Sequence, residues 1–202
     1  MRRRDFLKTA VTVPAVVAAT QWYEAAEALS LRSRRIRAVL YDERYADSRS
    51  FAQALEKQGV ISFAVSGDAA RVWYGALRVC LTQAGGSVAG MATHSDWLIS
   101  RLCGRELGLK AVYEGSHDSR ASHRLIHRLH GGGAEREVYA ALLHPGVPWA
   151  ESIARGLFRS LGRSGGAIGG TAPITRTDAV RTGGSSDHPG YLTSWLLDPS
   201  VP

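Results

Sequence analysis

Apolar residues along the chain follow two alternating patterns. Four short, mainly apolar runs predict strands, at 36–41, 60–65, 86–91 and 110–113, and the first is expected to be buried on both faces. Between these runs, apolar positions recur every three or four residues, as on one face of a helix, over 46–58, 73–80 and 95–107. Strands that alternate with helices predict right-handed β-α-β crossovers and a parallel sheet.

The third of these helices is expected to begin with Ser95 as its cap. Its apolar stripe is expected to face the core, and it comprises Leu98, Ile99, Leu102 and Cys103. Cys80 and Cys103 are the only cysteines in the sequence and lie on apolar helix faces. They are therefore expected to be small buried hydrophobes, or a disulfide if their helices are neighbours in an oxidising compartment.

The second half of the chain changes pattern after His117. Residues 122–130, a glycine-rich turn at 131–134 and residues 137–143 predict a β-hairpin at the sheet edge. A helix with Leu125, Ile126 and Leu129 on one face fits 122–130 nearly as well. A last amphipathic helix is expected from Pro148 to about Ser160.

The C-terminal part is expected to be a flexible tail over 162–202. Residues 162–190 are rich in Gly, Ser, Thr and Pro and have no periodicity, as in a long surface loop or a disordered segment. A short apolar patch follows, either docking back on the domain or meeting a partner, and it comprises Tyr191, Leu192, Trp195, Leu196 and Leu197.

The predicted fold class is α/β, with a mainly parallel sheet of four to five strands flanked by helices, an edge hairpin and a Gly/Ser-rich tail. This order of elements resembles the doubly wound sheets of flavodoxin-like and Rossmann-like proteins. The expected organisation is a signal segment at 1–28, one α/β domain at 29–161 and the tail at 162–202.

The N-terminus carries a basic motif directly before an apolar run over 9–20, and the motif residues are Arg3, Arg4, Phe6, Leu7 and Lys8. The motif resembles the twin-arginine export signal, Ser/Thr-Arg-Arg-x-Phe-Leu-Lys, with Arg2 in place of Ser or Thr. The run is shorter than the roughly 20 residues of a membrane span and contains Pro14. Cleavage is expected after Ala28, with an earlier alternative at Val17-Ala18-Ala19.

The resemblance implies export of the folded protein to the periplasm by the twin-arginine translocase, with retention at the membrane if the signal stays uncleaved. Proteins with such signals often carry a cofactor or join a cofactor-bearing partner before export. No cofactor motif identifies a cofactor here, and no membrane span is expected after signal removal.

The chain is basic, with a net charge of +7 from 25 Lys and Arg against 18 Asp and Glu. The signal segment contributes four basic and three acidic residues, so the remaining chain keeps +6. Such a domain could bind nucleic acid or an anionic membrane face. Export and the lack of an aromatic-interleaved basic motif argue against nucleic acid and favour a solvated arginine-rich surface.

Candidate chemistry is expected at the carboxyl ends of the parallel strands, where open α/β sheets bind ligands. The expected catalytic residues are His94, Asp68 and Asp42, and the expected ligand-binding residues are Arg44, Thr93, Glu114 and His117. Asp68 and Ser95 also suit helix caps. Asp42, Asp68, His94 and His117 could supply metal ligands, but their spacing does not impose a site and no metal is expected.

Other sites are not indicated. The turn after the first strand, 42–45, lacks the glycines of a pyrophosphate loop, and the chain has no Gly-x-Ser-x-Gly elbow. His123, His127 and His130 are expected to be surface histidines.

The leading functional hypothesis is therefore an exported accessory protein or subunit of a cell-envelope enzyme complex, such as a redox enzyme, with no activity of its own evident. The alternative is a small periplasmic enzyme or ligand-binding protein that uses the strand-end Asp/His cluster.

Overall fold

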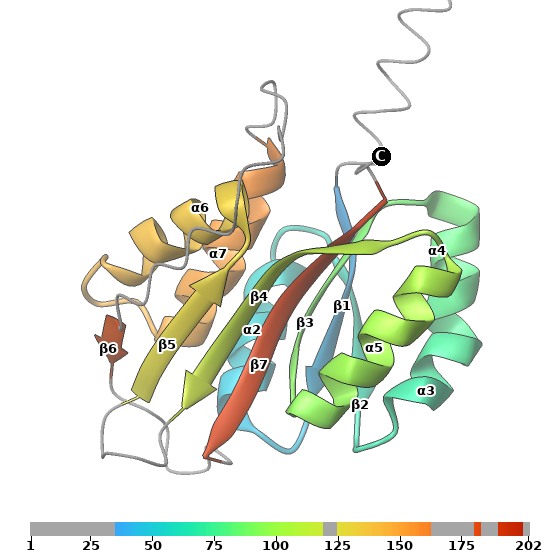
Figure 1. Cartoon of the computed structure of the whole chain (residues 1–202), viewed down its shortest axis with the longest axis horizontal. Coiled ribbons are helices and arrows are strands. Elements are labelled where there is room, and N and C mark those ends of the chain that lie inside the picture. The colour runs from blue at the N-terminus through green and yellow to red at the C-terminus, as the bar shows by residue number, and fades with distance from the viewer. Residues whose placement is uncertain (1–34, 119–124, 163–179, 183–189, 200–202) are drawn as a thin grey trace, which may run out of the picture.

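A mixed β-sheet lies between two layers of helices in the computed structural model of the chain (Figure 1). The structure describes residues 35–118, 125–162, 180–182 and 190–199. They form a seven-stranded sheet of order β2-β1-β3-β7-β4-β5-β6. The strands are β1 (Ile36–Asp42), β2 (Ile61–Val65), β3 (Ser87–Ala92), β4 (Lys110–Asp118), β5 (Leu125–His130), the three-residue β6 (Val180–Thr182) and β7 (Tyr191–Asp198).

The α/β class is confirmed, but the prediction of a mainly parallel sheet of four to five strands is wrong. Strand β1 pairs in parallel with β2 and β3, as the alternating pattern predicted. The other four pairings among the described strands, β3–β7, β7–β4, β4–β5 and β5–β6, are antiparallel. The sheet therefore joins a parallel half to an antiparallel half.

Strand β7 joins the two halves. Residues 191–198 therefore belong to the domain, and the expected flexible tail and the expected domain end at residue 161 are wrong for this segment. The apolar patch docks back on the domain as a central strand, in which every residue except Tyr191 is buried. Leu192 and Leu196 enter the core on one side of the sheet, and Trp195 and Leu197 enter the core on the other. A strand covered on both faces needs such a continuous apolar run. The remaining tail residues, other than 180–182, 190 and 199, lie outside the described part.

The predicted edge hairpin is also wrong. The strand interpretation of its first arm is confirmed as β5, but β5 pairs with β4 and β6. The second arm forms the helix α6 (Gly132–Leu142). Its buried residues include Ala134, Val138, Ala141 and Leu142, whose spacing matches a helix face.

The helices divide into two layers on opposite faces of the sheet (Figure 1). One layer contains α2 (Ala46–Glu56), α6 and α7 (Trp149–Gly162). The other contains α3 (Ala69–Val72), the π-helical segment η1 (Trp73–Leu77), α4 (Arg78–Ala84) and α5 (His94–Glu106). This division follows from right-handed crossovers, because the chain moves from β1 to β2 in one direction and from β2 to β3 in the other.

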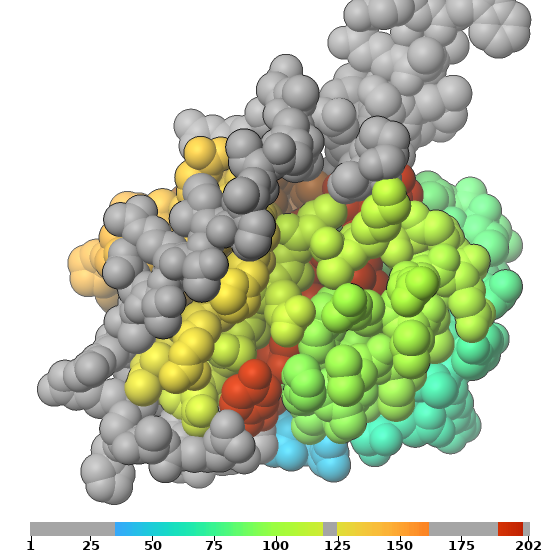
Figure 2. Space-filling model, viewed as in Figure 1, coloured from blue at the N-terminus to red at the C-terminus, as the bar shows by residue number. Residues whose placement is uncertain are grey.

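Helix α5 is rotated relative to the predicted core stripe. Trp97, Ser100 and Cys103 are buried, whereas Leu98 and Leu102 are exposed. Side chains of α5 accordingly form part of the outer surface seen in Figure 2. Within the described ranges, no helix is both long and apolar enough to span a bilayer.

Gly90 of β3 allows β7 to approach, so its substitution tests the central strand. A Cβ at this position would lie 2.8 Å from Nε1 of the fully buried Trp195. Gly90→Ala is expected to lower the free energy of unfolding by about 2–3 kcal/mol through overpacking, measured by urea denaturation. Gly133→Ala in α6, where a Cβ meets no atom within 4 Å, is the control and is expected to be neutral or stabilising.

Candidate functional site

The strand order reverses between β1 and β3, and three of the predicted site residues lie at the carboxyl ends of these strands. Asp42 is the last residue of β1, Arg44 follows it, and Thr93 follows β3. Connections leave this point toward both helical layers, which opens the edge of a doubly wound sheet to ligands. The predicted position of the site therefore corresponds to the switch point of this sheet.

Asp42 and Arg44 form a two-pronged ion pair. Arg44 donates from Nε to Oδ1 of Asp42 at 2.9 Å and from Nη2 to Oδ2 at 2.6 Å, and its backbone N–H donates to Oδ1 at 3.1 Å. The side-chain hydrogen bonds, followed by the charge of Asp42, raise the pKa of the guanidinium above its ordinary value. The carboxylate is fully buried, but the Arg44 side chain is 48% exposed. The pair therefore presents a fixed cation to solvent.

The backbone of Gly67, after β2, runs beside this guanidinium. A Cβ at Gly67 would lie 3.7 Å from Nη1 of Arg44, and the φ of +86° favours glycine. Asp68, which was predicted as a catalytic residue, instead begins a helix. Asp68 accepts a hydrogen bond from the Arg71 N–H at 3.0 Å as the N-cap of α3, which is the helix-cap alternative.

The N-terminus of α5 follows β3, which is parallel to β1, so it lies at the same edge of the sheet as Arg44. Thr93 is the N-cap, accepting from the Asp96 N–H at 3.4 Å and donating to Oδ2 of Asp96 at 2.6 Å, so Ser95 is not the cap as expected. The buried Asp96 carboxylate also contributes to the raised pKa of Arg44, after the larger effects of Asp42 and Tyr45. The first turn of α5 and the Arg44 side chain thus share one edge.

His94 does not form the expected acid–base cluster. Its ring is exposed, its Nδ1 lies 3.5 Å from Oγ1 of Thr193, and it meets the Tyr191 ring edge-on at 6.0 Å. Among the described residues it makes no hydrogen bond or ion pair with Asp42 or Asp68. His94 therefore lies against β7.

Glu114 is inside β4, because the strand continues to Asp118, and His117 is the second-last residue of that strand. In the sheet register Glu114 is opposite His130, on the sheet face that also carries Thr193. His117 is on the opposite face and fully buried. The expected cluster is therefore divided between the switch point, the α5 face of β4 and the core.

Sequence reasoning missed a buried polar network around His117. Its Nδ1 lies 2.8 Å from Nδ1 of His127, and its Nε2 lies 2.8 Å from Oγ of Ser194. The Tyr113 hydroxyl lies 3.2 Å from the same Oγ, and the Trp149 ring packs on both imidazoles, with centroids 4.8 and 5.1 Å away. All five side chains are buried. The expectation that His127 is a surface residue is therefore wrong.

The signal for this network was the strand alternation of Leu125, His127 and Leu129, which places a histidine on an apolar face. Ser194, His117 and His127 follow the order of a nucleophile, a base and an orienting group. Ser194 is completely enclosed, however, so no substrate can reach it in this structure. The network instead links β4, β5, β7 and the start of α7 through the core.

The remaining candidate chemistry is sparse. No group of three or more His, Cys, Asp or Glu side chains is arranged to hold a metal ion within the described segments. Cys80 is half-buried and Cys103 is buried, and both are free thiols. Burial raises the pKa of the Cys103 thiol, which makes it less nucleophilic.

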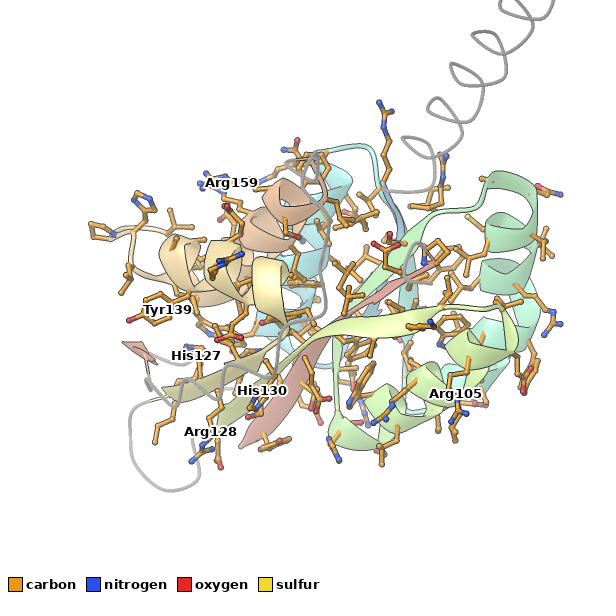
Figure 3. All side chains as sticks on the ribbon, turned by 45° about the horizontal axis from the view of Figure 1, so that its top comes forward. Arg105, His127, Arg128, His130, Tyr139 and Arg159 are labelled. Carbon is orange, nitrogen blue, oxygen red and sulfur yellow. The ribbon has the colours of Figure 1, made fainter. Side chains whose placement is uncertain are left out.

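The buried histidine pair should stabilise the protein. His127→Ala removes a hydrogen-bond partner of His117 and leaves a cavity, so it is expected to lower the free energy of unfolding by about 2–4 kcal/mol. His130→Ala is the control, because His130 is exposed on the other face of the same strand (Figure 3). It is expected to change stability by less than about 0.5 kcal/mol. Equal effects in urea denaturation would contradict the described packing.

The buried Tyr113 is expected to make the folded protein less stable at alkaline pH. Burial, the largest cause, raises the pKa of its phenol well above the ordinary value of about 10. Above about pH 10, the ordinary pKa of tyrosine, the unfolded chain releases this proton while the folded chain keeps it, so the free energy of unfolding falls as pH rises. Between about pH 8 and pH 10.5, Tyr113→Phe is expected to lose less unfolding free energy than the wild type. The same alkaline loss in both proteins would refute this assignment.

Comparisons with known proteins assign no family to the chain. No protein-family model matches it, and no significant match occurs among curated proteins or solved structures. The functional proposal therefore depends on the sequence motif and the geometry of the described residues.

Proposed function

We propose that the protein is an exported accessory protein, without catalytic activity of its own, that binds a small oxyanion-bearing ligand at the carboxyl edge between β1 and β3. The observation that carries this proposal is the half-exposed Arg44 guanidinium held by the buried Asp42 at the switch point. Its Nε and Nη2 are occupied by the carboxylate, and Nη1 makes no hydrogen bond to a described residue. A fixed guanidinium N–H is suited to a carboxylate or phosphate oxygen.

The exposed groups determine what a ligand meets. Arg44 is accessible, whereas the Asp42 and Asp96 carboxylates are buried. The exposed carboxylate of the same edge, Glu43, accepts a hydrogen bond from the Ser66 hydroxyl. Helix geometry leaves the N–H groups of His94 and Ser95, at the start of α5, without intrahelical acceptors. Such groups favour anions at a helix N-terminus. Arg44 and the first turn of α5 together support a small carboxylate or phosphate ligand.

The accessory role is supported by the site's lack of a reachable catalytic pair. Among the described residues, Asp42 is buried against Arg44, Asp68 caps α3, and Ser194 is enclosed. The twin-arginine-like motif supports periplasmic location, with the translocase as a transient partner and a cell-envelope enzyme, such as a redox enzyme, as a lasting one. The enzyme alternative would need His94 to act without a carboxylate partner.

Ligand titration tests this proposal. Inorganic phosphate and succinate, added to the full chain, are expected to shift the amide NMR signals of Gly67, His94 and Ser95. Arg44→Lys keeps the charge but loses the fork geometry, and it is expected to weaken binding of the better ligand about tenfold, measured by calorimetry.

Arg49→Lys is the matched control, since Arg49 is an exposed arginine of the same edge that donates to the Glu43 carbonyl at 2.6 Å. It is expected to leave the affinity within about twofold of the wild type. Equal weakening by both variants would show attraction by general charge and contradict a positioned site. The absence of any shift with either anion would also overturn the proposal.

A further inference from the structure

Three large side chains of η1 and α5 are unusually exposed. Leu98 and Leu102 of α5 are 46% and 62% exposed, and Tyr74 of η1 is 58% exposed. Leu98 and Leu102 are one helical turn apart, and the Tyr74 hydroxyl bonds Glu106 of α5 at 2.9 Å. The three side chains therefore belong to one surface, here named the α5–η1 surface.

The charges around these side chains are almost all positive. The helical segments 69–84 and 94–106 contain four arginines and two acidic residues, the buried Asp96 and the exposed Glu106, which gives a net charge of +2. Glu106 is already engaged, because it accepts from Tyr74 and lies 3.5 Å from Arg78. The other arginines make no ion pair with a described residue and are exposed, and they are Arg71, Arg101 and Arg105.

The opposite helical layer differs in charge. Helices α6 and α7 also expose apolar side chains, Leu143 beside α6 and Phe158 on α7. Their sequences contain three acidic and three basic residues, a net charge of zero, and Arg155 pairs with Glu151 at 2.6 Å. Figure 3 shows Arg105 on α5 and Arg159 on α7 in separate layers. The positive excess is therefore a property of one face.

We propose that the α5–η1 surface binds the anionic face of a phospholipid membrane. Guanidinium groups pair with lipid phosphates, and leucine side chains between them can enter the boundary between headgroups and acyl chains. The tyrosine, with an apolar ring and a polar end, suits the same boundary. A predominantly positive surface matches a bilayer, whose charge has one sign over a wide area, better than a protein partner of mixed charge. The attachment is peripheral, through side chains of a folded surface.

Membrane binding at the α5–η1 surface does not require a ligand at Arg44. Vesicle sedimentation tests this binding. The full chain is expected to bind phosphatidylcholine vesicles with about 30% phosphatidylglycerol, and to bind pure phosphatidylcholine much more weakly. The double variant Arg101→Gln and Arg105→Gln is expected to bind the anionic vesicles about 25-fold more weakly. Leu102→Ser is expected to weaken binding about fivefold.

Matched controls lie on the other layer. Arg136→Gln with Arg159→Gln removes two exposed charges, and Leu143→Ser removes a leucine that is 59% exposed. Both are expected to bind as the wild type does, and any contribution from the rest of the chain is common to all variants. Equal loss in test and control variants, or no preference for anionic vesicles, would overturn the proposal. A change in self-association of Leu102→Ser with unchanged vesicle binding would assign the surface to protein contact and also overturn it.

Discussion

The insertion of an antiparallel strand into the middle of the sheet is the constraint on which the rest of the structure depends. Strand β7 pairs with β3 on one side and β4 on the other, although these strands precede it by roughly 80 to 100 residues. It is covered on both faces, so its side chains complete both cores at once. Without β7, the parallel half and the antiparallel half would each keep an unpaired edge in the interior.

The two cores meet β7 in different ways. On the α5 side, Trp195 lies over Gly90 and stacks on Trp97 with ring centroids 5.3 Å apart. On the α7 side, Ser194 enters a hydrogen-bonded network with His117 and Tyr113. Buried polar groups are costly unless they are paired, and they then specify one arrangement of the strands. The apolar side gives β7 its burial, and the polar side favours its observed register.

Helix α5 connects the features with functional interest. Its first turn lies beside the Arg44–Asp42 pair at the switch point, its inner side packs Trp97 and Cys103 on the sheet, and its outer side carries Leu102 and Arg105. The same helix thus adjoins the proposed ligand site and the proposed membrane surface. The position of α5 depends on its packing against β3 and β7. Both the proposed ligand site and the proposed membrane surface therefore depend on the central strand.

The sequence by itself determined the parallel half of the fold and the edge at which Asp42, Arg44 and Thr93 meet. Those elements follow from local periodicity, and parallel strands necessarily end at one edge. Only the tertiary structure decided that β7 is central, that β4 continues through Glu114 to Asp118, and that His127 is buried. Strand pairing joins residues far apart in the chain, and a short apolar run has the same pattern whether it is a tail patch or a central strand. The exposed face of α5 was likewise decided by packing, because apolar residues cover more than one side of that helix and only its neighbours select the buried one.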